Sequence, residues 1–255
     1  MNTKLGELQR LKNEREKIVA LTAYDYPTAR LLDESGVDLL LVGDSLGMVV
    51  LGYPDTTCVT MEEMLHHTRA VARGVKRAPV LVDLPFGSCD NVPDAVANAR
   101  RLIEAGGDAV KLEGGASHVA QIEALVADGI PVMAHIGMQP QRVRIEGGYR
   151  VKGKTAPEAD GLLQDARAVE SAGCFALLLE LVTPDVASAI TAALRIPTIG
   201  IGAGTGCDGQ VLVTHDLLGL FPWFTPRFAK PRAALASEIQ RAAREFIDAT
   251  KNRAS

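Results

Sequence analysis

Aromatic residues are scarce in this sequence, and signals that mark several other protein classes are missing. Phe, Trp and Tyr make up 4% of the 255 residues, so Ala, Val, Leu and Gly must fill the core. The four cysteines show no C-x-x-C spacing, which disfavours a thiolate metal site and favours reduced thiols. No apolar run reaches the roughly 18 residues of a membrane span, and no secretory signal is visible. We therefore predict a soluble, cytoplasmic protein with no membrane partner.

A positive charge excess is also absent. Lys and Arg number 27 against 31 Asp and Glu, so the net charge is -4. A face that binds nucleic acid or an anionic membrane normally carries a basic excess, and we expect neither partner. Hydrophobic residues make up 47% of the chain and charged residues 23%, which is sufficient for a substantial core.

Short apolar runs alternate with helical patterns along the chain. The runs span residues 18–24, 38–45, 79–86, 108–115, 130–137, 175–182, 197–204 and 209–219. One helical pattern opens with Thr60 and Glu63 in capping-box spacing. Apolar strands that alternate with amphipathic helices predict a parallel sheet covered by helices. Eight such units in about 250 residues fit a (βα)8 TIM barrel, predicted as a single domain over 1–255, with a doubly wound open sheet as the alternative. The polar segment 5–16 predicts an extra N-terminal helix.

Polar side chains gather where the predicted strands end. They are Asp44, Ser45, Asp83, Lys111, Glu113, His135 and Glu180. Active sites of parallel barrels lie at the carboxyl ends of the strands, so these residues are the candidate site. Simpler interpretations stay open: Asp44 or Ser45 could cap the next helix, and His135 could be a satisfied core histidine. Glu180 stands among leucines, where a carboxylate needs a partner.

Asp44, Asp83 and Glu113 follow or end neighbouring predicted strands and would repel one another if left alone. A divalent cation resolves that repulsion, and an all-oxygen ligand set suits Mg2+. A chelating substrate such as a 2-oxo acid fits an ion that keeps open positions. Lys111, which strand alternation places on the same side as Glu113, can then neutralise the substrate carboxylate.

The sequence resembles the ketopantoate hydroxymethyltransferase (3-methyl-2-oxobutanoate hydroxymethyltransferase) family. The resemblance rests on motifs in the same order from about Leu21 to Gly219: "LTAYDY", "LLVGDSLGM", "LVDLPF", "VKLEGG", "HIGMQPQ", "GGYRVKG", "LLLELV" and "IGIGAG" followed by "DGQVLV" and "HDLLG". The tail "PRFAK" is also similar. Any one motif is weak evidence, but together they are specific.

The resemblance implies a barrel of the phosphoenolpyruvate/pyruvate type that is a one-carbon transferase. It implies transfer of a hydroxymethyl group from 5,10-methylenetetrahydrofolate to 3-methyl-2-oxobutanoate, giving 2-dehydropantoate for pantothenate and coenzyme A synthesis. It assigns Mg2+ to Asp44 and Asp83, with Glu113 in the coordination sphere through water. Substrate contacts fall on Asp44, Ser45, Asp83, Lys111 and His135, and the proton acceptor is Glu180. A homo-oligomer, a decameric ring, is the expected assembly.

Two other functions remain in competition at this point. A lyase or mutase of the same barrel class would use similar Mg2+ carboxylates together with a loop cysteine, for which Cys89 is the candidate. A non-catalytic barrel that binds an oxo acid or a metal would have no need of Glu180. The basic segment 138–155 predicts a mobile flap, whose charges either shield the reacting centre, meet the folate tail or are solvated.

Overall fold

The protein is described by a computed structural model over residues 3–251, so residues 1–2 and 252–255 of the predicted domain lie outside the described part. A closed parallel barrel is formed in the order β1-β2-β3-β4-β5-β6-β7-β8. The strands are β1 Ile18–Thr22, β2 Leu39–Val42, β3 Val80–Asp83, β4 Ala109–Glu113, β5 Val132–Gly137, β6 Ala176–Glu180, β7 Thr198–Ile201 and β8 Gly209–Leu212. Closure confirms the predicted barrel and excludes the open sheet.

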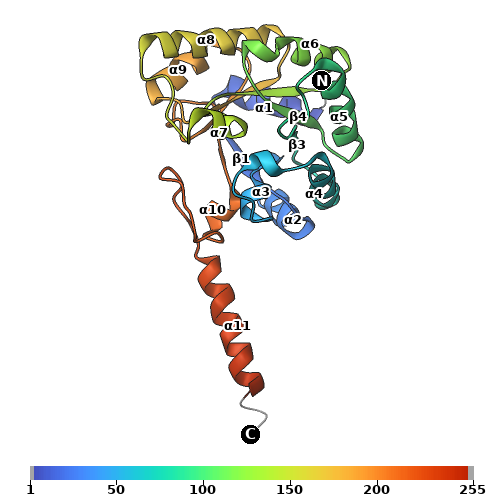
Figure 1. Ribbon diagram of the computed structural model, residues 1–255, viewed down its shortest axis with the longest axis vertical. Coiled ribbons are helices and arrows are strands. Elements are labelled where there is room, and N and C mark those ends of the chain that lie inside the picture. Colours follow the sequence, from blue (N-terminus) through green and yellow to red (C-terminus); the bar gives the residue numbers. More distant parts are fainter. Residues whose placement is uncertain (1–2, 252–255) are drawn as a thin grey trace. The chain divides into compact units, whose positions relative to one another are not determined.

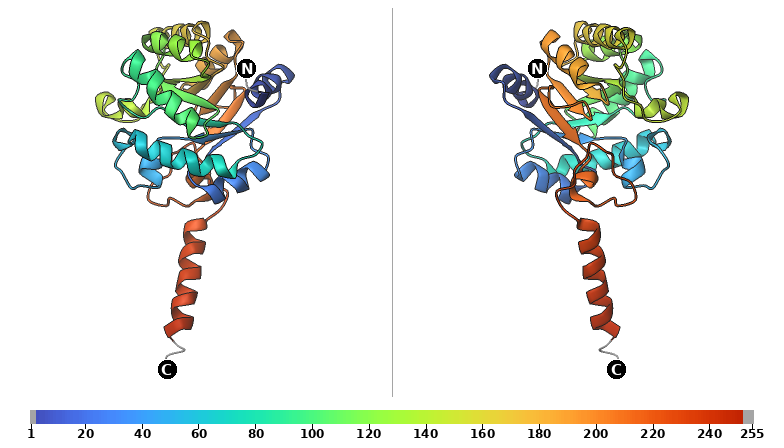
Figure 2. Two further views of the ribbon diagram at one scale, coloured as in Figure 1. Left: turned by 90° about the vertical axis from the view of Figure 1, so that its right-hand side faces the viewer. Right: turned by 90° about the vertical axis from the view of Figure 1, so that its left-hand side faces the viewer.

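The helices of the described chain are α1 Thr3–Glu14, α2 Tyr26–Glu34, α3 Leu46–Val49, α4 Met61–Gly74, α5 Val92–Glu104, α6 Val119–Ala127, α7 Val143–Glu146, α8 Ala156–Ser171, α9 Pro184–Ala193, α10 Thr214–Leu218 and α11 Leu235–Lys251, with 3-10 turns η1 Thr56–Cys58, η2 Ala116–His118 and η3 Pro140–Arg142. In the compact unit that ends at Val211, α2, α4, α5, α6, α8 and α9 follow strands and lie outside the barrel wall (Figures 1 and 2). The predicted capping box is present, because Thr60 and Glu63 exchange hydrogen bonds at the start of α4.

The apolar core inside the barrel fills its amino-terminal half. Leu5, Leu8 and Leu11 of α1 join the inward-facing residues of the strands in one buried cluster. The predicted extra N-terminal helix is therefore present, and its apolar face packs against the barrel interior. Because side chains of a strand alternate between two faces, the residues that follow these core positions at two-residue intervals point to the opposite, carboxyl end of the same interior.

The connection after β5 differs from the predicted irregular flap. Residues 138–155 contain η3 and α7, and Lys152 forms a bridge with Val182 just after β6. Met138 N–H also donates to the carbonyl of Glu180 at 2.8 Å. The segment is thus held to the end of β6 at both of its ends, while its predicted mobility stays a prediction.

The described chain divides into two compact units, with the boundary between Val211 and Leu212. The first contains α1 to α9, β1 to β7 and all of β8 but its last residue, Leu212; the second contains α10 and α11. No local pattern predicted α11, a 17-residue helix in which no residue is buried. The prediction of a single domain over residues 1–255 stays a prediction.

Candidate active site

The predicted site residues lie at the carboxyl ends of five neighbouring strands. Asp44 and Ser45 follow β2, Asp83 ends β3, Lys111 and Glu113 lie on β4, His135 lies on β5, and Glu180 ends β6. The parallel register pairs Asp83 with Lys111, and Glu113 with His135. Neighbouring strands therefore place these charged side chains at the same level along the barrel axis, inside one barrel.

Lys111 is the cation at the centre of this group. Its Nζ lies 3.0 Å from Asp83 Oδ1, 4.0 Å from Glu113 Oε1 and 3.3 Å from His135 Nδ1. The side chain is only 5% exposed, so burial opposes its charge, but the carboxylates of Asp83 and Glu113 outweigh burial and raise its pKa. The buried charges on β4 thus have opposite partners, as the sequence required.

Asp44 carries the least compensated negative charge. Its backbone N–H donates to Asp83 Oδ2 at 3.0 Å, and its own Oδ2 accepts from Gln141 Nε2 at 2.8 Å. Burial, followed by repulsion from Asp83 and Glu113, raises the pKa of Asp44 well above its usual value. A carboxyl that is buried against two like charges is stabilised by an added cation.

The other two carboxylates differ in their environment. Burial raises the pKa of Asp83, even though Lys111 opposes the shift. The pKa of Glu113 is also pushed up by burial, but hydrogen bonding to His135 and the charges of His135 and Lys111 lower it overall. Among Asp44, Asp83 and Glu113, the negative charge of Glu113 is therefore the one that neighbouring residues stabilise best.

His135 connects the two acidic sides of the site. Its Nδ1 lies 3.4 Å from Glu113 Oε1, and its Nε2 lies 3.3 Å from Glu180 Oε2. Burial and Lys111 lower its pKa, but Glu113 and Glu180 prevail and raise it to about 9. His135 is thus a buried histidine with a carboxylate beside each ring nitrogen, and its role in binding the substrate stays a prediction.

Glu180 is the most accessible of the buried acids, with a side chain 13% exposed against 3% for Asp83 and Glu113. Its leucine neighbours Leu177 and Leu179 alternate to the outer face of the strand, so its partner inside the barrel is His135. Leu181, the next residue, has a φ of 47°, in the left-handed region that a leucine rarely occupies. Such backbone strain clusters at functional sites.

Ser45 stands at the start of α3, but its side chain makes no capping hydrogen bond. Its Oγ instead lies 2.8 Å from the hydroxyl of the buried Tyr24. The capping interpretation of Ser45 is thus wrong. Tyr24, in the motif "LTAYDY", is a supporting residue that the sequence analysis did not single out.

Gln141 is the main contact that sequence reasoning missed. It is buried, lies in η3 and reaches back to the acidic group through its side chain and its backbone N–H. Gln141 belongs to the motif "HIGMQPQ", which could be recognised in the sequence. No local pattern, however, predicts that an uncharged residue in a polar connection is buried against carboxylates.

The basic residues of segment 138–155 are partly neutralised by neighbours. Arg144 Nε pairs with Asp55 Oδ2 at 2.8 Å, and Lys152 pairs with Glu146 at 2.5 Å. Tyr149 of this segment is 46% exposed, and its hydroxyl lies 3.9 Å from Met48 Sδ, so the segment also reaches α3.

A fit to Mg2+ can be tested on these carboxylates. Within residues 3–251, no three His, Cys, Asp or Glu side chains are arranged as they stand to hold a metal ion. Asp83 Oδ1 and Glu113 Oε1 are nevertheless buried and face only charged partners, Lys111 at 3.0 and 4.0 Å and, for Glu113, His135 at 3.4 Å. Mg2+ needs only one or two carboxylates, because it keeps several waters. The adjacent Asp44 and Asp83 fit that demand.

Cys89 does not have the character of a reactive thiol. It is buried, and burial, followed by the charges of Asp90 and Glu113, raises its pKa to about 11. Reactive cysteines are partly exposed and have a lowered pKa. The lyase or mutase alternative therefore loses the residue that the sequence offered for it.

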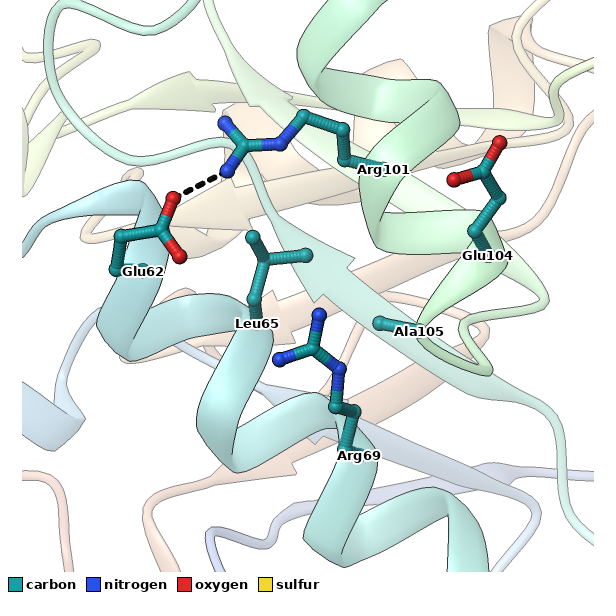
Figure 3. Close-up of a pocket in the computed structure, with 6 residues that line it drawn as sticks. All are labelled: Glu62, Leu65, Arg69, Arg101, Glu104 and Ala105. Atoms are coloured by element: carbon teal, nitrogen blue, oxygen red, sulfur yellow. Dashed lines mark hydrogen bonds and ion pairs between the residues drawn. The ribbon is translucent and has the colours of Figure 1, made fainter.

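A pocket on the outer wall is separate from this site. It lies between α4 and α5 and is lined by Glu62, Leu65, Arg69, Arg101, Glu104 and Ala105, with Glu62 and Arg101 joined by an ion pair (Figure 3). None of these residues belongs to the group inside the barrel. Among the described residues, we also find no helix with the length and apolar character that crossing a bilayer requires.

Comparison with known proteins gives a family across almost the whole chain. The family described as ketopantoate hydroxymethyltransferase matches residues 2–254. The chain is 53% identical over 249 residues to a 3-methyl-2-oxobutanoate hydroxymethyltransferase of Clostridium novyi (strain NT), covering 97% of this chain and 90% of the relative. A protein of the same name from Moorella thermoacetica is 55% identical, with 96% and 91% covered.

Solved structures resemble the barrel more distantly. A putative phosphonomutase from Burkholderia cenocepacia J2315 superposes with a TM-score of 0.68 at 18% identity, covering 93% of this chain and 99% of that one. A 2,3-dimethylmalate lyase, described as a member of the PEP mutase/isocitrate lyase superfamily, gives 0.63 at 18% identity, with 100% and 90% covered. At this identity the likeness shows a shared barrel fold alone.

Proposed function

Because the chain belongs to the ketopantoate hydroxymethyltransferase family, we propose that the carboxyl end of its barrel carries out that family's reaction. The protein is an enzyme that transfers a hydroxymethyl group from 5,10-methylenetetrahydrofolate to 3-methyl-2-oxobutanoate, giving 2-dehydropantoate in pantothenate and coenzyme A synthesis. The observation that carries the assignment of residues is the pairing of Glu180 with His135 inside the same barrel end that holds Asp44, Asp83 and Lys111.

Asp44 and Asp83 are the proposed Mg2+ ligands, with Glu113 reaching the ion through water. The raised pKa values of Asp44 and Asp83 support this assignment, because both report negative charge that burial disfavours. Glu113, whose charge His135 and Lys111 already stabilise, is suited to the outer position. When bound, Mg2+ supplies Lewis-acid polarisation of the substrate's keto oxygen.

Lys111, Ser45, His135 and the two aspartates surround the proposed place of the oxo acid. The Lys111 ammonium is a fixed positive charge that offsets the substrate carboxylate. The Ser45 hydroxyl, oriented by Tyr24 at 2.8 Å, is a hydrogen-bonding partner for the same group. These residues bind and orient the substrate rather than exchange protons with it.

Glu180 is the proposed general base. Its carboxylate takes the proton from C3 of the oxo acid, and the electron pair of that C–H bond moves into an enolate. One water molecule replaces both C–N bonds that hold the one-carbon unit, so that tetrahydrofolate leaves. C3 of the enolate bonds to that carbon, and the oxygen from water takes up a proton and becomes the hydroxyl group of the product. His135, 3.3 Å away through Nε2, fixes the direction of the carboxylate. Segment 138–155, which is hydrogen-bonded to the end of β6, is the proposed shield of the enolate.

Proton exchange at C3 tests this role without the folate. NMR of 3-methyl-2-oxobutanoate in D2O with protein and Mg2+ should show loss of the C3 proton signal. Glu180→Gln keeps the size of the side chain and should slow exchange about 10²- to 10⁴-fold, the usual contribution of a positioned base. Glu123→Gln, on the exposed side of α6, is the matched control and should exchange like the wild type. Unchanged exchange in Glu180→Gln would remove Glu180 from the role.

The assembly and the compartment are also proposals. We propose a homo-oligomer, a decameric ring, which light scattering of the purified full chain would reveal as a mass near ten times 27.1 kDa. A cytoplasmic location agrees with the free thiols of all four cysteines, since disulfides are rare in that compartment.

A further inference from the structure

Gln141 joins three strand ends of the proposed site although it lies on none of them. Its Nε2 donates to Asp44 Oδ2 at 2.8 Å and to the carbonyl of Leu84 at 3.0 Å. Its backbone N–H donates to Glu113 Oε2 at 3.0 Å. The residue is therefore bonded to groups that follow β2 and β3 and to the carboxylate that ends β4.

The chemistry of these contacts allows only one arrangement of the side chain. A carboxylate oxygen and a carbonyl oxygen are both acceptors, so only the NH2 end of the amide can face them. Gln141 has two side-chain donors, and each acceptor takes one. A glutamate of the same shape would put a further negative charge against Asp44, and an apolar residue would leave Asp44 Oδ2 without this donor.

Gln141 also connects the acidic side of the site with the side of the base. The segment that carries it is joined to β6 at both ends, because Met138 N–H donates to the carbonyl of Glu180 and Lys152 N–H donates to the carbonyl of Leu181, each at 2.8 Å. The segment that contains η3 is therefore bonded to Asp44 through the Gln141 amide and to Glu180 through the backbone N–H of Met138.

We propose that Gln141 is a positioning residue of the reaction, whose side-chain amide holds Asp44 in the orientation that binds the divalent cation. The inference rests on the proposed Mg2+ site at Asp44 and Asp83. Gln141 itself contacts neither the substrate nor the ion. Residues that orient ligands in this way usually change metal affinity about 10- to 100-fold when they are lost.

Mn2+, followed by electron paramagnetic resonance of the free ion and without substrates, measures cation binding directly. Gln141→Met keeps the length of the side chain and removes both donors, while the backbone bond to Glu113 is kept. We expect its Kd for Mn2+ to rise about 10- to 100-fold. Gln139→Met, two residues earlier in the same segment, is the matched control and should bind like the wild type. Glu180→Gln should also leave the Kd unchanged, because it alters the base and not the ligands.

A second readout separates positioning from general damage to the fold. In the C3 exchange assay, Gln141→Met should need about 10- to 100-fold more Mg2+ for half-maximal exchange, with the exchange rate at saturating Mg2+ largely regained. If Gln141→Met yields no folded protein by circular dichroism, Gln141→Asn, whose amide is one methylene too short to reach both acceptors, takes its place and is read in the same way.

The outcomes distinguish this inference from the function on which it rests. An equal Kd for wild type and Gln141→Met would overturn the positioning role and leave the metal site standing. Absence of Mn2+ binding by the wild type would overturn the metal site itself, and the role of Gln141 with it. A raised Kd in Gln139→Met of the same size as in Gln141→Met would show that the whole segment, rather than the amide, governs binding, and would likewise overturn the proposal.

Discussion

Replacement of Lys111 by Met tests how strongly the buried cation supports the acidic group. The substitution keeps the aliphatic stem and removes the charge that lies 3.0 Å from Asp83 and 4.0 Å from Glu113. At an effective dielectric constant of about 20, these separations correspond to attractions of about 5.5 and about 4 kcal/mol. The net loss is smaller, because the ammonium no longer has to be buried and a carboxylate can take up a proton instead.

Protonation of one of the two carboxylates limits the loss of unfolding free energy in Lys111→Met. Neutralising one carboxyl with an ordinary pKa near 4 costs about 4 kcal/mol at pH 7 and about 1.4 kcal/mol at pH 5. We therefore expect Lys111→Met to lose about 3–5 kcal/mol of unfolding free energy at pH 7, in the range for breaking a buried ion pair from one side. The loss at pH 5 should be about 1–2 kcal/mol.

The direction of this pH dependence follows from the cited pKa shifts. Lys111 lowers the pKa of both Asp83 and Glu113, so its removal raises both values in the folded state, and that of Asp83, which burial already raises, moves further above its unfolded value. A carboxyl with a raised folded-state pKa contributes stability that is complete below the unfolded pKa and is lost as the pH rises through the folded value. The variant should thus approach the wild type on acidification.

Urea unfolding followed by circular dichroism, in EDTA so that no cation replaces the ammonium, measures the difference at pH 5 and pH 7. Lys154→Met, at an exposed position, is the control and should stay within about 0.5 kcal/mol of the wild type. A Lys111→Met protein as stable as the wild type at pH 7 would refute the reasoning, since the carboxylates would then be neutralised without Lys111.

Two further substitutions test the scaffold around the site. Asp33 accepts hydrogen bonds from three successive backbone N–H groups before β3, which outweigh burial and lower its pKa, so Asp33→Asn should cost about 2–3 kcal/mol at pH 7. The difference should shrink as the pH falls below about 4 and wild-type Asp33 takes up its proton; Glu34→Gln, one residue on and exposed, should change urea stability by less than about 1 kcal/mol. Gly137→Ala would place a Cβ 2.3 Å from the carbonyl of Glu180, so thermal stability and C3 exchange should both fall. Gly129→Ala has a similar positive φ and open space, and its smaller loss of stability with normal exchange is the comparison; equal behaviour of the two would show that the contact with Glu180 is unimportant.

Much of the fold was accessible from local patterns. The alternation of apolar runs with helical segments predicted the parallel barrel, and the capping box at Thr60 predicted where α4 begins. The two short helical pieces inside residues 138–155 and the helix α11 were not predicted. A short 3-10 turn forms where tertiary contacts hold it, and α11 follows none of the strand-and-helix units by which the barrel was predicted.

In the candidate site, too, some features were predicted from the sequence and others were not. The charges at strand ends were predicted, because strand alternation and chain direction alone place them on one side and at one end. Their partners were not: the sequence grouped Asp44, Asp83 and Glu113 around one ion, whereas the structure places Lys111 and His135 between them as well. Their joint role in binding Mg2+ stays a prediction.

The sequence by itself determined which residues form the apolar strands and to which face of a strand each side chain points. It also determined that acidic and basic groups lie at the strand ends. Those features depend on neighbours a few positions apart. Only the tertiary structure decided which of the groups meet, because closure and register of the barrel bring together residues as distant as Asp44 and Gln141, 97 positions apart. These tertiary contacts set the balance between burial and charge at each carboxyl group. That balance determines the affinity of the group for a proton or a cation, and no local sequence pattern contains it.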